Sequence, residues 1–151
     1  MSSSIAEIVD YSAWLVASRV PGIAAIRAPG TSGLWDPLTG DPILPPADAP
    51  TMPYEHWSEL PMGTTINFAT QDGTMAYTWE VPMRLWFARV DVRSLRAVAI
   101  PFYAAYLHAF MPDSTLGGLC QTAHPTKFEI GVDDKWGWLD ITLEVQEMVT
   151  E

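Results

Sequence analysis

Residues 138–146 read WLDITLEVQ, and from Leu139 onward apolar and polar side chains alternate strictly. A period of two predicts a β-strand with one face in the core and one face toward water. Lys127 to Ile130 and a turn at residues 133–135 precede this strand, so we expect a hairpin to close the chain. The inward side chains are Leu139, Ile141, Leu143 and Val145, and the outward ones are Asp140, Thr142, Glu144 and Gln146.

A long apolar segment that ends at Phe110 precedes this hairpin. Its apolar residues share one helical face, and Pro101 fits best in a first turn, which predicts a helix that starts near Ala99. A longer helix kinked at Pro101 is the alternative. Pro112 and two glycines then end the helix. The residues expected to form a structural turn are Asp113, Thr115, Gly117 and Gly118.

A second hairpin is predicted in the centre of the chain. Residues 75–87 place seven apolar side chains at alternate positions, and the weaker alternation of residues 64–70 is joined to them by Asp72-Gly73. Pro82 interrupts the longer strand, and because proline has no N–H we expect it at a sheet edge or a bulge.

The N-terminal segment predicts one more helix and a short strand. Ser4 and Glu7 have the spacing of a capping box, and Pro21 with the glycine after it ends the helix. Tyr11 and Trp14 lie off the apolar stripe, so they either meet a second core layer or form a partner surface. Residues 23–27 are expected to form a short strand.

Residues 28–63 differ sharply from the rest of the chain. They hold eight of the 13 prolines and no apolar period, which argues against a helix or a central strand. We therefore expect one long proline-rich loop inserted in a single domain of residues 1–151. Trp35 and Trp57 in this loop are candidate contacts for a partner.

These elements predict an α+β fold. Its antiparallel sheet is built from the two hairpins plus the short strand, and the two helices pack on one face of the sheet.

Composition limits the functions that this chain can have. There are 18 acidic and 8 basic residues, a net charge of −10, which disfavours stable binding to nucleic acid or to an anionic membrane. The N-terminus lacks the pattern of a secretory signal, and the longest apolar stretch is too short to span a bilayer. A single cysteine excludes an intrachain disulfide and suits a reducing compartment.

No group of residues has the spacing of a catalytic or metal site. His56, His108 and His124 lack metal-ligand spacing, and Cys120 near His124 has no orienting third group. Asp133-Asp134 is typical of a solvated turn. We therefore expect no enzyme activity, no metal and no cofactor; a small ligand-binding or hydrolytic domain that uses Cys120 and His124 is the alternative from another class.

Charge is unevenly distributed along the chain. Residues 113–151 hold eight acidic side chains against two lysines, whereas residues 84–96 hold four arginines against one aspartate. Such a pattern suits head-to-tail contact between copies, in which the basic segment of one meets the acidic segment of the next. The arginines are Arg84, Arg89, Arg93 and Arg96.

The order of these elements resembles the tail terminator, or tail completion, proteins of long-tailed bacteriophages. The resemblance rests on the first helix ending at VPG (20–22), the strand at residues 76–90, the helix before FMPDSTLGG (110–118) and the strand ending in LDITLEV (139–145). It covers the ends and the centre of the chain and leaves out residues 28–63.

This resemblance implies a structural virion protein of the head–tail junction, assembled in the host cytoplasm. It would form a homo-oligomeric ring, hexameric in this family, that caps the tail tube protein, ends tube polymerisation and joins a head-side connector or stopper. A head-closure or tail-tube subunit is the alternative within the same particle. DNA would pass without stable binding, along an acidic wall for which the candidates are Glu80, Asp140, Thr142 and Glu144. Interface candidates are the four arginines with Tyr11, Trp14, Trp35 and Trp57.

Overall fold

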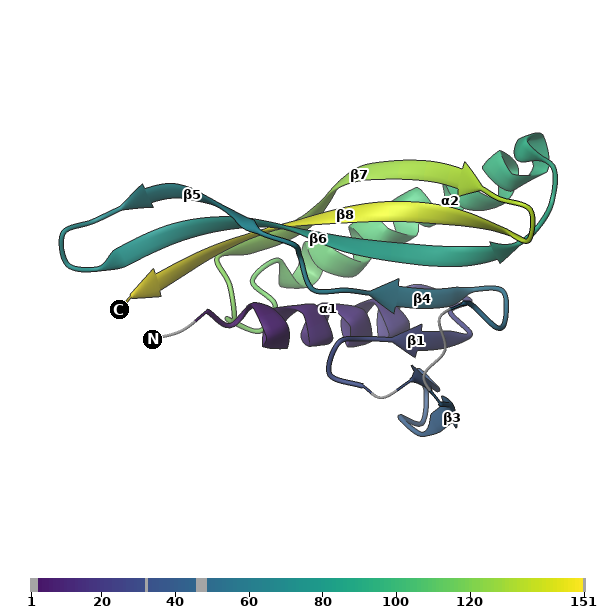
Figure 1. Cartoon of the computed structure of the whole chain (residues 1–151), viewed down its shortest axis with the longest axis horizontal. Helices are drawn as coiled ribbons and strands as arrows, with labels where there is room; N and C mark the ends of the chain where they lie inside the picture. Colours follow the sequence, from purple (N-terminus) through teal and green to yellow (C-terminus); the bar gives the residue numbers. More distant parts are fainter. Residues whose placement is uncertain (1–2, 32, 46–48, 151) are drawn as a thin grey trace.

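The protein is an eight-stranded, mostly antiparallel sheet with two helices, which confirms the α+β class (Figure 1). This computed structural model describes residues 3–31, 33–45 and 49–150. Residues 1–2, 32, 46–48 and 151 lie outside the described residues, and so do the corresponding parts of the predicted loop.

Two strands of 15 residues form the axis of the sheet. β6 (Thr74–Ala88) and β8 (Trp136–Thr150) pair antiparallel along their whole lengths. β7 (Thr122–Val132) pairs with the other side of β8, and β5 (Thr64–Ala69) pairs with the first part of β6. A slip of one residue would turn the buried side chains of β8 toward water, so the alternation fixes this register.

Four short strands extend the sheet beyond β6. β4 (Glu55–Ser58) pairs antiparallel with β6, and β1 (Ala25–Arg27) lies parallel to β4. β2 (Leu34–Trp35) and β3 (Pro42–Leu44) follow outward from β1. The expectation that residues 28–63 form one loop without a central strand is therefore wrong, because β4 lies between β1 and β6.

β4 enters the sheet through buried polar side chains. His56 and Ser58 point inward and are almost fully buried. The Nδ1 atom of His56 lies 2.7 Å from the hydroxyl of Tyr106, and its Nε2 atom lies 2.8 Å from the hydroxyl of Ser58. These hydrogen bonds satisfy groups that would otherwise be costly to bury, so the strand needs no apolar period.

Pro82 lies within a strand that has neighbours on both sides. β5 pairs with β6 as far as Trp79, and β4 pairs with β6 from Met83 onward, so Pro82 falls in the gap between them. Its carbonyl accepts a hydrogen bond from the amide of Glu59 on that side. The proline is thus placed where its missing N–H breaks no ladder bond.

Both helices pack on the same face of the sheet. α1 (Ile5–Arg19) and α2 (Val92–Phe110) share one apolar core with β6 and β8, and a short 3-10 helix, η1 (Met111–Asp113), follows α2. The largest fully buried apolar side chains include Tyr106, Phe110, Ile8, Met83, Leu85, Leu139 and Ile141.

The predicted capping box of α1 is wrong. Ser4 is at the N-cap position, but its side chain makes no capping hydrogen bond. Glu147 of β8, which is only 4% exposed, instead accepts hydrogen bonds from the Ser4 amide at 2.9 Å and the Ser3 hydroxyl at 2.6 Å. A carboxylate beside a helix N-terminus is favoured by the free amides and the helix dipole.

α2 starts earlier than the predicted position near Ala99. Asp91 is its N-cap, and the carboxylate accepts hydrogen bonds from the Ser94 amide at 2.9 Å and the Ser94 hydroxyl at 2.8 Å. Leu95 in the first turns is fully buried and anchors them. The cap and this anchor outweigh the cost of Pro101 inside the helix, so the longer-helix alternative is the correct one.

One end of the sheet projects beyond the helices as an arm (Figure 1). The arm consists of β5, the first six residues of β6 and the last residues of β8. All six residues of β5 are exposed, and Ile66 and Phe68 are 56% and 50% exposed. Apolar side chains on an edge strand favour association with another chain.

Candidate functional site: the open face of the sheet

The sheet face opposite the helices is formed by the even-numbered residues of β6 and β8. The register places Arg84 opposite Asp140 and Trp86 opposite Trp138. No helix covers this side in the part of the chain that the structure describes, so we call it the open face. Residues on it that are distant in sequence form two groups, one aromatic and one acidic.

The aromatic group is a tryptophan cluster of Trp57, Trp86, Trp136 and Trp138. The ring of Trp86 lies at its centre, with edge-to-face contacts to the rings of Trp57 at 5.3 Å, Trp138 at 5.6 Å and Trp136 at 6.4 Å. Such contacts stabilise each ring in a defined orientation. The cluster therefore forms a rigid surface in the middle of the open face.

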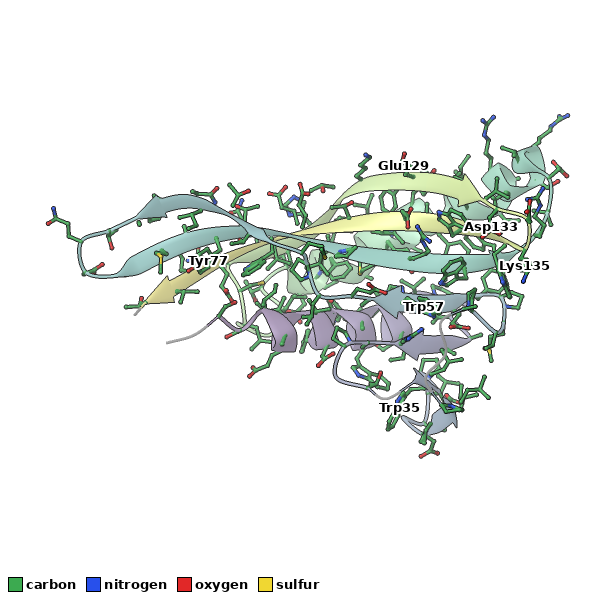
Figure 2. The ribbon with its side chains drawn as sticks, in the orientation of Figure 1. Trp35, Trp57, Tyr77, Glu129, Asp133 and Lys135 are labelled. Atoms are coloured by element: carbon green, nitrogen blue, oxygen red, sulfur yellow. The ribbon has the colours of Figure 1, made fainter. Side chains whose placement is uncertain are left out.

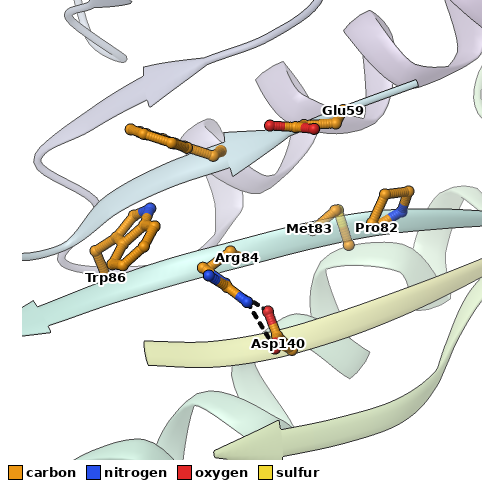
Figure 3. Close-up of a pocket in the computed structure, with 7 residues that line it drawn as sticks. Glu59, Pro82, Met83, Arg84, Trp86 and Asp140 are labelled. Carbon is orange, nitrogen blue, oxygen red and sulfur yellow. Dashed lines mark hydrogen bonds and ion pairs between the residues drawn. The ribbon is translucent and has the colours of Figure 1, made fainter. Parts of the chain in front are cut away.

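Arg84 joins this cluster to the acidic side chains. Its guanidinium lies 4.4 Å from the ring centre of Trp138 and 5.0 Å from that of Trp86. Arg84 also donates two hydrogen bonds to Asp140, from Nε to Oδ1 at 2.7 Å and from Nη2 to Oδ2 at 3.1 Å (Figure 3). The predicted interface arginine and the predicted channel carboxylate thus neutralise each other within one chain.

A pocket of about 280 Å³ opens beside this ion pair. We call it the Trp86 pocket; it is lined by Trp57, Glu59, Pro82, Met83, Arg84, Trp86 and Asp140 (Figure 3). Trp86 is 7% exposed, and its indole N–H has no hydrogen-bond partner among the described residues. Figure 3 shows this nitrogen on the side of the ring that faces Arg84 and Glu59. A buried donor without an acceptor costs free energy and calls for an explanation.

The acidic group lies further along the same two strands. Glu80 is directly opposite Glu144, and Thr142 lies opposite Pro82. Glu129 of β7 is opposite Asp140 and pairs with Lys127 at 3.5 Å (Figure 2 shows Glu129). The structure therefore brings all four predicted channel residues to one face, although the charge of Asp140 is balanced by Arg84.

The predicted aromatic contacts occupy different surroundings. Tyr11 is 38% exposed and donates a hydrogen bond to Asp113 at 2.7 Å, and Trp14 is half-buried beside it in a shallow hollow. That hydrogen bond is the main cause of the raised pKa of Tyr11. Trp35 is half-buried in β2, with an unpartnered indole N–H among the described residues (Figure 2). Trp57 belongs to the tryptophan cluster.

The four predicted interface arginines divide into two pairs. Arg84 is bound to Asp140, and Arg89 donates a hydrogen bond to the carbonyl of Asp133 at the β7–β8 turn. Arg93 and Arg96 lie exposed at the start of α2. Within the described residues no ion pair holds either of them, so they are the cations left for contact with another molecule.

The segment after η1 is a tight turn. The carboxylate of Asp113 accepts a hydrogen bond from the Gly117 amide at 2.9 Å, which is the main cause of its lowered pKa. Gly117 and Gly118 have φ angles of 68° and 88°, a region that favours glycine. The Thr115 carbonyl accepts a hydrogen bond from the Cys120 amide at 3.2 Å. The four residues predicted to form a turn are used here for backbone geometry.

The chemistry of Cys120 does not suit a nucleophile. Burial, then the charges of Glu147 and Asp113, raise the pKa of its thiol to about 11. A thiol with such a pKa is almost fully protonated at neutral pH and reacts slowly. Among the described residues, no three His, Cys, Asp or Glu side chains gather in a way that could hold a metal ion.

Comparison with the models of known protein families and with curated proteins found no match. In residues 3–31, 33–45 and 49–150, no helix is both long enough and apolar enough to cross a membrane. The function must therefore be inferred from the residues themselves.

Sequence reasoning missed the Trp86 pocket. Trp86, Trp138 and Glu59 were not singled out, because they lie far apart in the sequence and only the strand register brings them together. A signal was present in part: Trp86 and Trp138 both occupy the outward positions of strands whose inward positions are apolar.

Proposed function

We propose that this chain is a structural protein of the head–tail junction of a long-tailed bacteriophage. Copies of it would assemble into a ring, hexameric by analogy with the family that it resembles. The ring would end tail-tube growth and offer its other side to the head connector or stopper. The acidic part of the open face would then line the channel through which DNA passes.

The observation that carries this proposal is the Glu80–Glu144 pair. Two carboxylates directly opposite each other on neighbouring strands destabilise a sheet. No cation is paired with either of them within the described residues. A face that must let DNA slide past gains from such a pair, because like charge prevents the duplex from binding.

The projecting arm and the free arginines support assembly into a ring. Ile66 and Phe68 expose apolar surface on an edge strand, and Arg93 with Arg96 offers positive charge in a chain whose net charge is −10. A contact between two different surfaces of the same chain generates a closed ring when the rotation between copies closes.

Tail length in particles made without this protein tests the proposal. Loss of a terminator gives overlong tubes, whereas loss of a tube subunit gives no tubes, and loss of a head-closure protein gives tails of normal length. Electron microscopy of the purified protein with tail tubes should show rings at tube ends. Tails of normal length together with a protein that never binds tubes would exclude the terminator role.

A further inference from the structure

The Trp86 pocket requires a partner with particular chemistry. The indole N–H of Trp86 needs an acceptor, and the carboxylate of Glu59 is exposed and needs donors. Arg84 and Asp140 cancel each other's charge. A neutral group that both accepts and donates hydrogen bonds meets these needs better than an ion does.

The size of the pocket suits one side chain. Its volume of about 280 Å³ lies at the lower end of the range for small-molecule sites. A carboxamide side chain is flat enough to lie along the indole of Trp57, and its oxygen and nitrogen can serve Trp86 and Glu59 at once. Asparagine or glutamine is therefore the fitting occupant.

The arm carries a glutamine at its tip. Gln71 is exposed in the β5–β6 turn, between Thr70 and Asp72, whose side chains hydrogen-bond each other. Thr70 also accepts a hydrogen bond from the Thr74 amide at 3.2 Å. These contacts leave the carboxamide of Gln71 free to leave the turn and hold its backbone in place.

The tip of one chain cannot reach the pocket of the same chain. Both lie on β6, and the separation from the tip to Arg84 is on the order of 40 Å at the rise of an extended strand. β6 is held along its length by β8, so it cannot fold back. The occupant must therefore come from a second copy, displaced by about one subunit.

Apolar surface lies beside both the tip and the pocket. Leu60 and Met62 follow Glu59 and are 48% and 104% exposed. Ile66 and Phe68 lie a few residues from the tip. Contact between these two pairs would bury apolar area around a polar centre, as in stable protein interfaces.

We propose that the arm of one copy docks on the open face of the next and inserts the Gln71 carboxamide into its Trp86 pocket. This inference deepens the ring proposal and rests on it, because it names the contact that joins the copies. The acidic pair Glu80–Glu144 lies further along β6 than the pocket and stays uncovered.

Mixing two defective variants tests this contact. Gln71→Ala removes the inserted group, and Glu59→Arg fills the entrance of the pocket at an exposed position. We expect each variant alone to associate about tenfold more weakly than the wild type, the effect of one lost hydrogen bond to a buried donor. A mixture in equal amounts should form complexes of two copies and stop there, because only one intact tip and one intact pocket remain. Native mass spectrometry counts the copies.

Matched controls separate this effect from loss of folding. Gln121→Ala removes a glutamine from the body of the protein, and Trp136→Phe changes a cluster member that does not line the pocket. Both should assemble like the wild type. Rings that form equally well in Gln71→Ala and Glu59→Arg would overturn the docking contact while leaving the ring proposal intact. A wild-type chain that stays monomeric even with tail tubes would contradict the ring proposal itself.

A disulfide between copies gives a direct geometric test. Chains with Gln71→Cys and chains with Glu59→Cys, both in a Cys120→Ala background, are mixed under oxidising conditions. We expect a cross-linked pair, since the two Cα atoms must come within disulfide reach. Gln146→Cys on the open face replaces Glu59→Cys in the control. Equal cross-linking in the control, or none with Glu59→Cys, would overturn the proposal.

Discussion

His56 is a buried histidine that the fold keeps neutral. Burial lowers its pKa from 6.5 to about 3. Between these values the unfolded chain binds a proton that the folded chain does not, so the free energy of unfolding must fall as pH falls below 6.5. We expect the slope attributable to His56 to approach about 1.4 kcal/mol per pH unit. Urea unfolding between pH 7 and pH 5 should show this slope in the wild type and lack it in His56→Gln; equal slopes would contradict it.

Arg84 combines an ion pair with contacts to two aromatic rings. Arg84→Lys keeps the charge but loses the second hydrogen bond to Asp140 and the planar group over Trp138. Both side chains of the pair are more than a third exposed, so we expect a loss of only about 1 kcal/mol in the free energy of unfolding. Arg93→Lys, at an exposed position, should change stability by less than about 0.5 kcal/mol. Equal effects in urea unfolding would exclude a special role for Arg84.

At the scale of elements, the pairing of β7 with β8 depends on Gly131. A Cβ atom there would overlap the indole of Trp138, which lies opposite it. We expect Gly131→Ala to displace this ring from Trp86 and to lower the free energy of unfolding by about 1 to 3 kcal/mol. Near-ultraviolet circular dichroism and urea unfolding measure the two effects. Gly63→Ala is the matched control, because a Cβ atom there meets open space. An unchanged aromatic spectrum in Gly131→Ala would contradict the packing.

The elements also show why part of the fold was predictable. β6 and β8 have long alternating patterns, and their inward side chains are apolar. β4 has no such pattern, because the residues that it buries are His56 and Ser58, and their partner Tyr106 lies on α2. The start of α2 was misplaced because Pro101 was given more weight than the cap at Asp91.

At the scale of the whole molecule, the candidate site was predictable only in part. The outward positions of β8 identified Asp140, Thr142 and Glu144 from periodicity alone. The opposition of Glu80 to Glu144, and the pairing of Asp140 with Arg84, depend on a register between strands about 60 residues apart in the sequence. Periodicity gives the face of each strand, but the tryptophan cluster and the pocket need the position of one strand against the next.

The acidic pair on the open face predicts how the assembled protein treats DNA. We expect the wild-type ring to show no binding of duplex DNA, and Glu80→Lys/Glu144→Lys to bind it with an affinity that falls steeply with salt. Glu7→Lys/Asp134→Lys makes the same change in net charge away from this face and is the control. Fluorescence anisotropy of labelled duplex across a salt series measures binding, and the rate of DNA release from particles measures its consequence. Because only a charge that faces the channel can slow the passing duplex, release should slow in the first variant alone. Equal binding and equal release in the two variants would show that this face does not line the channel.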